Sequence, residues 1–289
     1  SQVETWLGTL VEDDDSPFSA LNAALWSGGL YLEVPAGATL SLPIRLLCDL
    51  NLDDGVAFPR SLIAIGENAQ VTLVDELSTA LDSARGLMMN RAVELIVGAG
   101  AQVKMASLQN SPKGATSYTA ARTRVHRDAS LSYVFGSFSG GTTKVDLTTD
   151  LAEPGANVDT LGFVFGRARQ AFDHHAVQRH LAHDTTSHLD VRVALDDRAK
   201  SAATGLLWIG HEGYRSEAYQ ENRNLLLSEN ANAISLPELE ILTDDVKASH
   251  GATGGPVDPE QLYYLMTRGL SPSEAEALVV AGFFEPLLQ

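Results

Sequence analysis

The sequence predicts an all-β protein, a right-handed parallel β-helix of two stacked parallel sheets that ends in an α-helical hairpin. Three observations support this prediction: a short motif that recurs along the chain, alternating apolar and polar runs after each copy, and two helices with clear capping signals at the end. We expect a partly helical N-terminal segment over residues 1–27, the β-helix over 28–255 and the helical domain over 256–289.

The recurring motif is a turn containing Gly, Asn or Asp, followed by Ala and then by an alternating apolar and polar run. Gly, Asn and Asp accept the positive φ of a tight turn, and the small Ala fits a crowded corner. The run after the Ala has the period of a strand with one buried face. We therefore expect corresponding corners at Ala38, Ala69, Ala101, Ala129 and Ala156, with a late copy at Ala231.

The spacing of these copies selects the architecture. The alanines at 38, 69, 101, 129 and 156 are separated by 31, 32, 28 and 27 positions. A repeat of this length is typical of a solenoid, in which each unit buries its apolar face only by stacking on the next. Because no helical pattern interrupts the repeat, a parallel β-helix with two strands per coil is expected. The alternative is a β-sandwich, whose turn signals every 8–12 residues also occur here.

Helices are predicted at both ends of the chain. Residues 18–26 are compatible with a short helix. Near the other end, Asp258 is an N-cap candidate with Pro259 at the first helical position, and Ser271 begins a capping box with Glu274. Each of these two helices carries an apolar stripe, and we expect the stripes to dock a partner through Leu262, Leu265, Met266, Leu278, Val279 and Phe283.

Composition excludes several classes of protein. The chain has 289 residues, 44% of them hydrophobic, so it can bury a sizeable core. Its net charge of −17 repels nucleic acid and anionic membrane surfaces, so neither is expected as a partner. No run approaches the roughly 20 apolar residues that span a bilayer. With the single cysteine, Cys48, these features predict a soluble, cytoplasmic protein without disulfides.

Motifs for enzymatic chemistry are missing from the sequence. It has no Walker A phosphate-binding motif, no dinucleotide fingerprint and no nucleophile elbow, so we do not expect an enzyme. Histidines crowd one region, at 174, 175, 180, 183 and 188, with His211 further on, but they lack the spacing of metal ligands. They are interpreted as surface or ladder histidines. Cys48 alone cannot hold an iron–sulfur cluster, which takes several thiolates, and it is expected to be a small buried hydrophobe.

The last quarter of the strand region contains the most specific residues. The runs Gln220–Ser228 and Ser235–Ile241 are predicted to be two strands joined by an Asn-containing turn, and Asp244–Thr253 a tight Gly-containing loop that presents His250. A histidine there can donate or accept a hydrogen bond or ligate a metal. The alternative is a loop histidine that covers the end of the β-helix.

These runs, together with Tyr264–Gly269, resemble the SufB/SufD family of iron–sulfur cluster assembly proteins over roughly residues 20–289. The resemblance implies a non-enzymatic scaffold subunit that pairs with a SufB-like subunit through its late strands and binds a SufC-like ABC ATPase through its C-terminal helices. It also implies that His250 faces the partner subunit and ligates iron or a nascent Fe–S cluster at that interface, while this chain alone holds no cofactor. A homodimer is a further state open to the isolated chain.

The sequence departs from the family pattern in two places. Ala248 stands where the family often has Cys, which leaves His250 as the only ligand in the motif, and the family's longer helical N-terminal region is not represented by residues 1–27. Two functions of other classes stay open. One is a β-helical carbohydrate-active enzyme, which would need a carboxylate cluster in a groove; the other is an interaction scaffold with no iron chemistry, in which His250 is dispensable.

Overall fold

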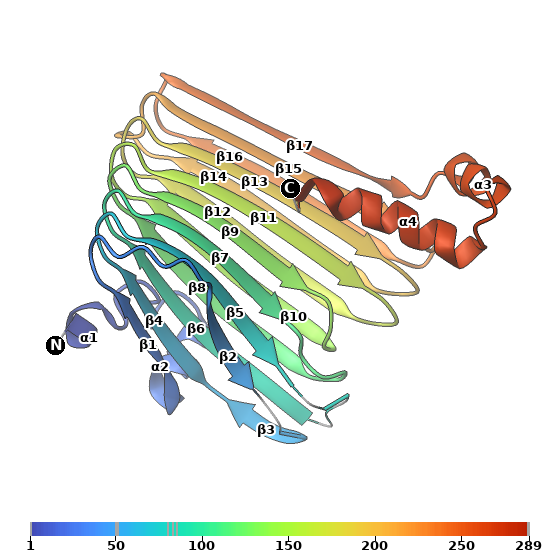
Figure 1. Ribbon diagram of the computed structural model, residues 1–289, viewed down its shortest axis with the longest axis horizontal. Helices are drawn as coiled ribbons and strands as arrows, with labels where there is room; N and C mark the ends of the chain where they lie inside the picture. Colours follow the sequence, from blue (N-terminus) through green and yellow to red (C-terminus); the bar gives the residue numbers. More distant parts are fainter. Residues whose placement is uncertain (1, 50–51, 80, 83, 85, 288–289) are drawn as a thin grey trace.

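Strands alternate between two stacked sheets along most of the chain, as the computed structural model shows (Figure 1). The structure describes residues 2–49, 52–79, 81–82, 84 and 86–287. Every pairing between the described strands is parallel, and strands inside the sheets pair with strands one coil earlier and one coil later. The predicted parallel β-helix is therefore confirmed, and the sandwich alternative is excluded because its sheets are antiparallel.

The two sheets are named here A and B. Sheet A contains β1 (Gly28–Val34), β3 (Asp54–Ala57), β4 (Pro59–Ile65), β6 (Gly86–Val97), β8 (Thr116–Val125), β10 (Thr142–Leu151), β12 (Ala171–His180), β14 (Lys200–Ile209) and β16 (Asn232–Ile241). Sheet B contains β2 (Ile44–Asp49), β5 (Gln70–Ser78), β7 (Gln102–Gln109), β9 (Ser130–Ser137), β11 (Asn157–Gly166), β13 (Thr186–Leu195), β15 (Ser216–Leu226) and β17 (Val246–Pro256).

The repeated alanines mark one corner of the solenoid. Ala69, Ala101, Ala129 and Ala156 are buried, and each stands directly before a strand of sheet B. The first residues of those four strands lie in register with one another, and Thr39, which follows Ala38, bridges to Gln70. The five predicted corners therefore correspond, as expected.

Turn chemistry explains why these corners form. The residue before each alanine has positive φ, at 72° for Gly37, 56° for Asn68, 68° for Gly100, 54° for Asp128 and 77° for Gly155. Gly, Asn and Asp are the residues that tolerate this conformation.

The late copy of the motif belongs to the other corner. Ala231 precedes β16 of sheet A and stacks on Ala199, which precedes β14, because Lys200 and Asn232 lie in register. The sequence grouped it with the first five because both corners require a small residue after a turn.

The core fills the space between the sheets. Every second residue of a strand points inward, and the buried positions are mostly aliphatic, with Phe135, Tyr133 and Phe172 as the larger fillers. Residues such as Leu73, Leu131 and Leu195 have no more than 2% of their surface exposed. Burying a side chain of this size stabilises the fold by about 1.5–3 kcal/mol.

The N-terminal segment packs on the outer face of sheet A. It contains α1 (Gln2–Trp6) and α2 (Pro17–Leu25), and α2 contacts β6. The predicted helix over 18–26 thus begins one residue earlier and ends one earlier, with Ser16 as its N-cap. The buried carboxylate of Glu94 in β6 accepts hydrogen bonds from the backbone of Gly8, Leu10 and Val11, which fixes the loop between the two helices.

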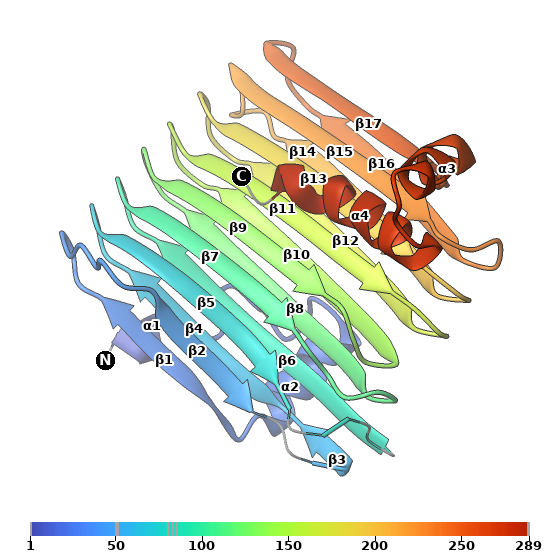
Figure 2. The same ribbon diagram turned by 45° about the vertical axis from the view of Figure 1, so that its right-hand side comes forward.

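The C-terminal helices lie on the opposite side of the molecule (Figure 2). They are α3 (Pro259–Thr267) and α4 (Pro272–Phe284), followed by a 3₁₀ turn, η1 (Glu285–Leu287). The predicted N-cap at Asp258 and the capping box of Ser271 and Glu274 are both present. Within the described ranges, none of the helices has the length and apolar character needed to cross a bilayer.

The helical hairpin is attached to the flank of the solenoid, against sheet B, and does not cover its end. Helix α4 contacts β13, where Arg192 donates a 2.6 Å hydrogen bond to the carbonyl of Phe283. The ring of Phe284 meets Phe163 of β11 edge-on at 6.3 Å between centroids. The last coil, β16 and β17, is consequently left open.

Candidate functional site

The C-terminal end of the solenoid is an open double edge. Strand β16 pairs with β14 and β17 pairs with β15, and both are the last strands of their sheets among the residues that the structure describes. Such edges offer unpaired backbone N–H and C=O groups to another strand. On the outer face of β16, Ile234 and Leu236 are 51% and 50% exposed. The end of the molecule is therefore suited to pairing with a second chain.

His250 lies within β17, not in a loop. Its Cα is in register with that of Gln220 in β15, and the strand continues to Pro256. The loop prediction was wrong because the glycines were taken as turn residues. Gly251 instead pairs in register with Glu221 in the ladder to β15.

The side chain of His250 belongs to the inward face of the open end. Val246 and Ala248 pack toward the interior beside Leu207 and Ile209, and His250 follows Ala248 by two positions along the strand. Strand alternation places residues two apart on one face. His250 is exposed because no further coil covers it. A second molecule at this end would thus meet His250 at the mouth of the interior, next to the position of Ala248.

The interior beneath His250 is polar. Gln220, Asn222 and Asn224 occupy successive inward positions of β15, where earlier coils carry mostly aliphatic residues. The amide of Gln220 donates to the carbonyl of Glu238 at 3.2 Å, and that of Asn224 donates to the Ser235 hydroxyl at 2.7 Å. The three side-chain carbonyl oxygens have no hydrogen-bond partner among the described residues. These buried acceptors make the interior beneath the open end polar.

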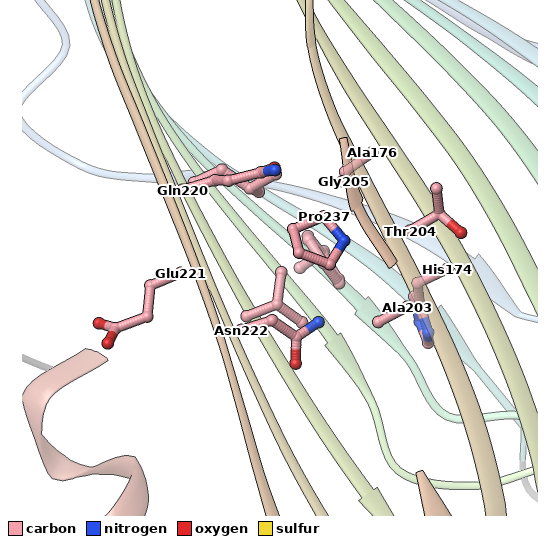
Figure 3. Close-up of a pocket in the computed structure, with 12 residues that line it drawn as sticks. His174, Ala176, Ala203, Thr204, Gly205, Gln220, Glu221, Asn222 and Pro237 are labelled. Atoms are coloured by element: carbon pink, nitrogen blue, oxygen red, sulfur yellow. The ribbon is translucent and has the colours of Figure 1, made fainter. Parts of the chain in front are cut away.

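A small cavity lies inside the same part of the solenoid (Figure 3). Its volume is about 20 Å³, room for about one water molecule. His174 enters it from β12 and Gln220 from β15. The Nε2 atom of His174 lies 3.0 Å from the Ser137 hydroxyl, while Nδ1 has no partner within the described chain. The cavity thus gives a water molecule polar neighbours on two of its sides.

Two of the clustered histidines are buried, which the surface or ladder interpretation did not anticipate. His174 is 3% exposed and His180 is fully buried, with hydroxyls of Thr185 at 2.7 Å and Ser187 at 2.8 Å from its ring nitrogens. Burial lowers the pKa of each to about 4, so both imidazoles are neutral near pH 7. Both side chains point inward because they lie at alternate positions of β12, on the same face as Phe172 and Ala176. Among the described residues, no group of three or more His, Cys, Asp or Glu side chains could hold a metal ion.

These two histidines should make the fold acid-sensitive. Their folded-state pKa of about 4 lies below the value of 6.5 expected in the unfolded chain. Between those limits the unfolded state binds more protons, so the free energy of unfolding falls as pH falls. From pH 7 to pH 5 the loss should be about 2 kcal/mol per histidine.

Urea unfolding at the two pH values measures this loss. The variant His174→Gln removes one titrating group, and its unfolding free energy should depend less steeply on pH than that of the parent protein. Equal pH dependence in the two proteins would contradict a neutral, buried His174.

The predicted docking residues do not all share one surface. Leu265, Leu278 and Val279 line a shallow hollow between α3 and α4 together with Tyr264. Leu278 and Met266 are 52% and 41% exposed, and Leu262 is half-buried. Phe283 instead faces the solenoid, with the Arg192 guanidinium 5.9 Å from its ring centroid.

Two large side chains on the hairpin were not predicted. Tyr263 and Tyr264 are 70% and 57% exposed on α3. The predicted docking residues lie on the apolar stripe of each helix, and the adjacent tyrosines that follow Leu262 are the signal in the sequence for this further surface. They extend the apolar surface of the hairpin beyond the predicted residues.

These features define a parallel β-solenoid protein with one open end and a helical hairpin on its flank. Residues 49–283 match the family model of the SUF system FeS cluster assembly SufBD core domain, and the chain belongs to this family. It is 33% identical to the iron-sulfur cluster assembly protein SufD of Bacillus subtilis, over 96% of this chain and 64% of that protein. It is 28% identical to SufB of the same organism, over 98% of this chain and 60% of SufB. A SufBD family protein of Staphylococcus saprophyticus is 30% identical over 97% of this chain and 60% of that protein. The chain thus spans less than two thirds of the length of these relatives.

Proposed function

We propose that this chain is a non-enzymatic, cytoplasmic scaffold subunit that pairs with a SufB-like subunit and a SufC-like ATPase to build nascent Fe–S clusters. The observation that carries this proposal is the open double edge of β16 and β17 with His250 on its inward face. The alternative, a β-helical carbohydrate-active enzyme, has no comparable observation in its favour. The open edge and His250 are explained by pairing with a second subunit and do not require a substrate groove.

The partner is inferred from the edge itself. Both sheets end in a parallel strand, so a second parallel solenoid can continue both by strand addition. Proteins named SufB and SufD align with nearly all of this chain, so members of either name are expected to share its solenoid. A SufB-like subunit therefore has the shape that fits, and a second copy of this chain is the alternative when no partner is present.

Iron chemistry in this proposal requires residues of the partner. Cys48 is in β2, at the opposite end of sheet B from β17, and Ala248 supplies no thiolate beside His250. Imidazole can replace thiolate at some cluster irons, but one histidine does not hold a cluster. His250 would therefore contribute one ligand, and the partner subunit would supply the others.

Affinity capture of the tagged chain from its native host tests the proposal. We expect a SufB-like protein and an ABC-type ATPase to be retained in stoichiometric amounts, while the purified chain alone binds no iron. Recovery of the chain as a homodimer with neither protein would overturn it.

A further inference from the structure

The N-terminal end of the solenoid is open as well. Among the residues that the structure describes, β1 pairs only with β4, and β2 pairs only with β5. A hollow of about 620 Å³ lies at the mouth of the first coil and is lined by residues of both sheets. Leu42, Leu47 and Val56, all at this end, are more than half exposed. Unpaired strand edges beside exposed apolar side chains are typical of a surface that another chain covers.

The free edge of β2 presents the backbone of three residues. In β5, Gln70 exchanges backbone hydrogen bonds with the first coil, so every second residue from there, including Val74, faces β2. Val74 is in register with Arg45. In a parallel ladder, the residue opposite such a position directs its own N–H and C=O to the other side. The backbone groups of Arg45, Leu47 and Asp49 therefore point away from β5, toward the open edge.

The side chains of the same three residues lie on the outer face of sheet B. They alternate along β2 with less exposed residues that face the interior. The guanidinium of Arg45 donates to Glu76 of β5 through Nε at 2.9 Å, yet the side chain is 61% exposed. A guanidinium has five N–H donors, so it can bond a second carboxylate on its other side. An arginine and an aspartate thus stand at equal distances on either side of an exposed leucine.

We propose that the N-terminal end binds a second copy of this chain, with the two β2 strands paired antiparallel about a two-fold axis at Leu47. This pairing places Arg45 of each copy opposite Asp49 of the other, so the contact contains two pairs of opposite charge. The two Leu47 side chains meet on the outer face. The backbone groups at the open edge all find hydrogen-bond partners, because residues 45, 47 and 49 face residues 49, 47 and 45.

Charge and symmetry select this arrangement over the other ways to join two copies. Parallel pairing in register would place Arg45 opposite Arg45 and Asp49 opposite Asp49, and like charges directly opposite each other are destabilising. Antiparallel pairing shifted by two residues would leave Leu47 opposite a charged side chain. Stacking of the N-terminal end of one copy on the C-terminal end of another would continue into a filament, whereas a two-fold contact closes with two copies.

The contact goes beyond the function proposed above and uses a different part of the molecule. The C-terminal end with His250 lies at the opposite end of both sheets from β1 and β2. It therefore stays available to a SufB-like subunit when the N-terminal ends of two copies are joined.

Sedimentation of the 289-residue chain over a series of concentrations tests the two-fold contact. We expect a monomer–dimer equilibrium. Arg45→Asp or Asp49→Arg replaces two attractive pairs by two repulsive ones, so each should raise the dimer dissociation constant at least about tenfold. The double variant Arg45→Asp, Asp49→Arg restores opposite charges and should dimerise nearly as well as the parent. Arg169→Asp, an exposed charge reversal in the turn between β11 and β12, is the matched control and should dimerise normally.

Three results of the sedimentation experiment would contradict the proposal. A parent chain that is monomeric throughout the series would exclude the dimer. A dimer that both single variants retain would place the contact on another surface, such as the C-terminal end. A double variant as weak as the single ones would exclude the register about Leu47.

Oxidation of single-cysteine variants checks the register directly, in a Cys48→Ser background. The two Leu47 residues are expected to lie opposite each other with about 5.5 Å between their Cα atoms, within reach of a disulfide, so Leu47→Cys should form a covalent dimer. The parent should not, because its two Cys48 residues are diagonal neighbours about 7–8 Å apart. A mixture of Arg45→Cys and Asp49→Cys chains should form a mixed disulfide, and neither chain should do so alone. Oxidation of Leu47→Cys no faster than that of Arg169→Cys would overturn the proposal.

Discussion

Deletion of Asp258–Gln289 should abolish binding of the ABC-type ATPase and leave the β-solenoid folded. The hairpin contacts the outer face of sheet B, for example through Phe284 with Phe163, and it adds no strand to either sheet among the described residues. Its removal therefore exposes a small apolar area but leaves every coil intact. Far-ultraviolet circular dichroism should report unchanged strand content, and calorimetric titration should show no binding of the ATPase.

A single substitution makes this test sharper. Leu278 lines the hollow between α3 and α4 and is 52% exposed, so Leu278→Asp alters the docking surface without disturbing a core. At a central contact it should weaken binding by about 2 kcal/mol, roughly thirtyfold. The matched control is Leu47→Asp, an equally exposed leucine in β2 at the other end of the solenoid, which should bind the ATPase normally. Full affinity of the truncated chain would contradict docking by the hairpin.

Replacement of His250 by alanine should lower the cluster yield of the reconstituted complex several-fold without preventing its assembly. The side chain is exposed at the open edge, so its removal leaves no buried group unpaired and the backbone ladder of β17 to β15 remains. The expected defect is the loss of one iron ligand, measured as iron and acid-labile sulfide per complex and as visible absorbance. Complex formation and ATPase activity should stay near those of the parent.

The control for this experiment has to be an exposed histidine that lies outside β17. His174 is unsuitable because it is buried against Ser137, so His174→Ala would perturb the core. His211 is exposed in the turn before β15, and His211→Ala should give normal cluster yield. Equal yields from His250→Ala and His211→Ala would favour an interaction scaffold with no iron chemistry.

Local signals in the sequence predicted much of this architecture. The corner alanines could be predicted because every coil needs a small residue at the same corner, at nearly constant spacing. The caps of α3 and α4 could be predicted because a capping motif lies within about four consecutive residues. The buried histidines could also have been predicted. His174 and His180 share the inward phase of Phe172, but polar residues were assumed to face solvent.

Features that depend on register between distant residues could not be predicted. The pair Arg60–Glu94 joins two neighbouring strands of sheet A, and Arg91–Asp75 joins sheet A to sheet B. Nothing in a single sequence fixes which residues of such distant strands come together. The position of His250 was missed for a related reason. A glycine-rich segment lacks the alternation of apolar and polar side chains that predicts a strand. This segment is a strand because its backbone pairs with β15.

The coil-on-coil arrangement has a consequence for cooperativity. Most inner strands are held by two neighbours, whereas β16 and β17 at one end, and β1, β2 and β3 at the other, have one each. The molecule therefore approximates a one-dimensional lattice with nearest-neighbour coupling, in which opening begins at the ends and propagates inward like a zipper. Amide protons of β17 should exchange fastest and those of β9 and β10 slowest. A subunit that adds a coil at the open end would give β16 and β17 a second neighbour each. Unfolding from that end would then be slower for the whole chain.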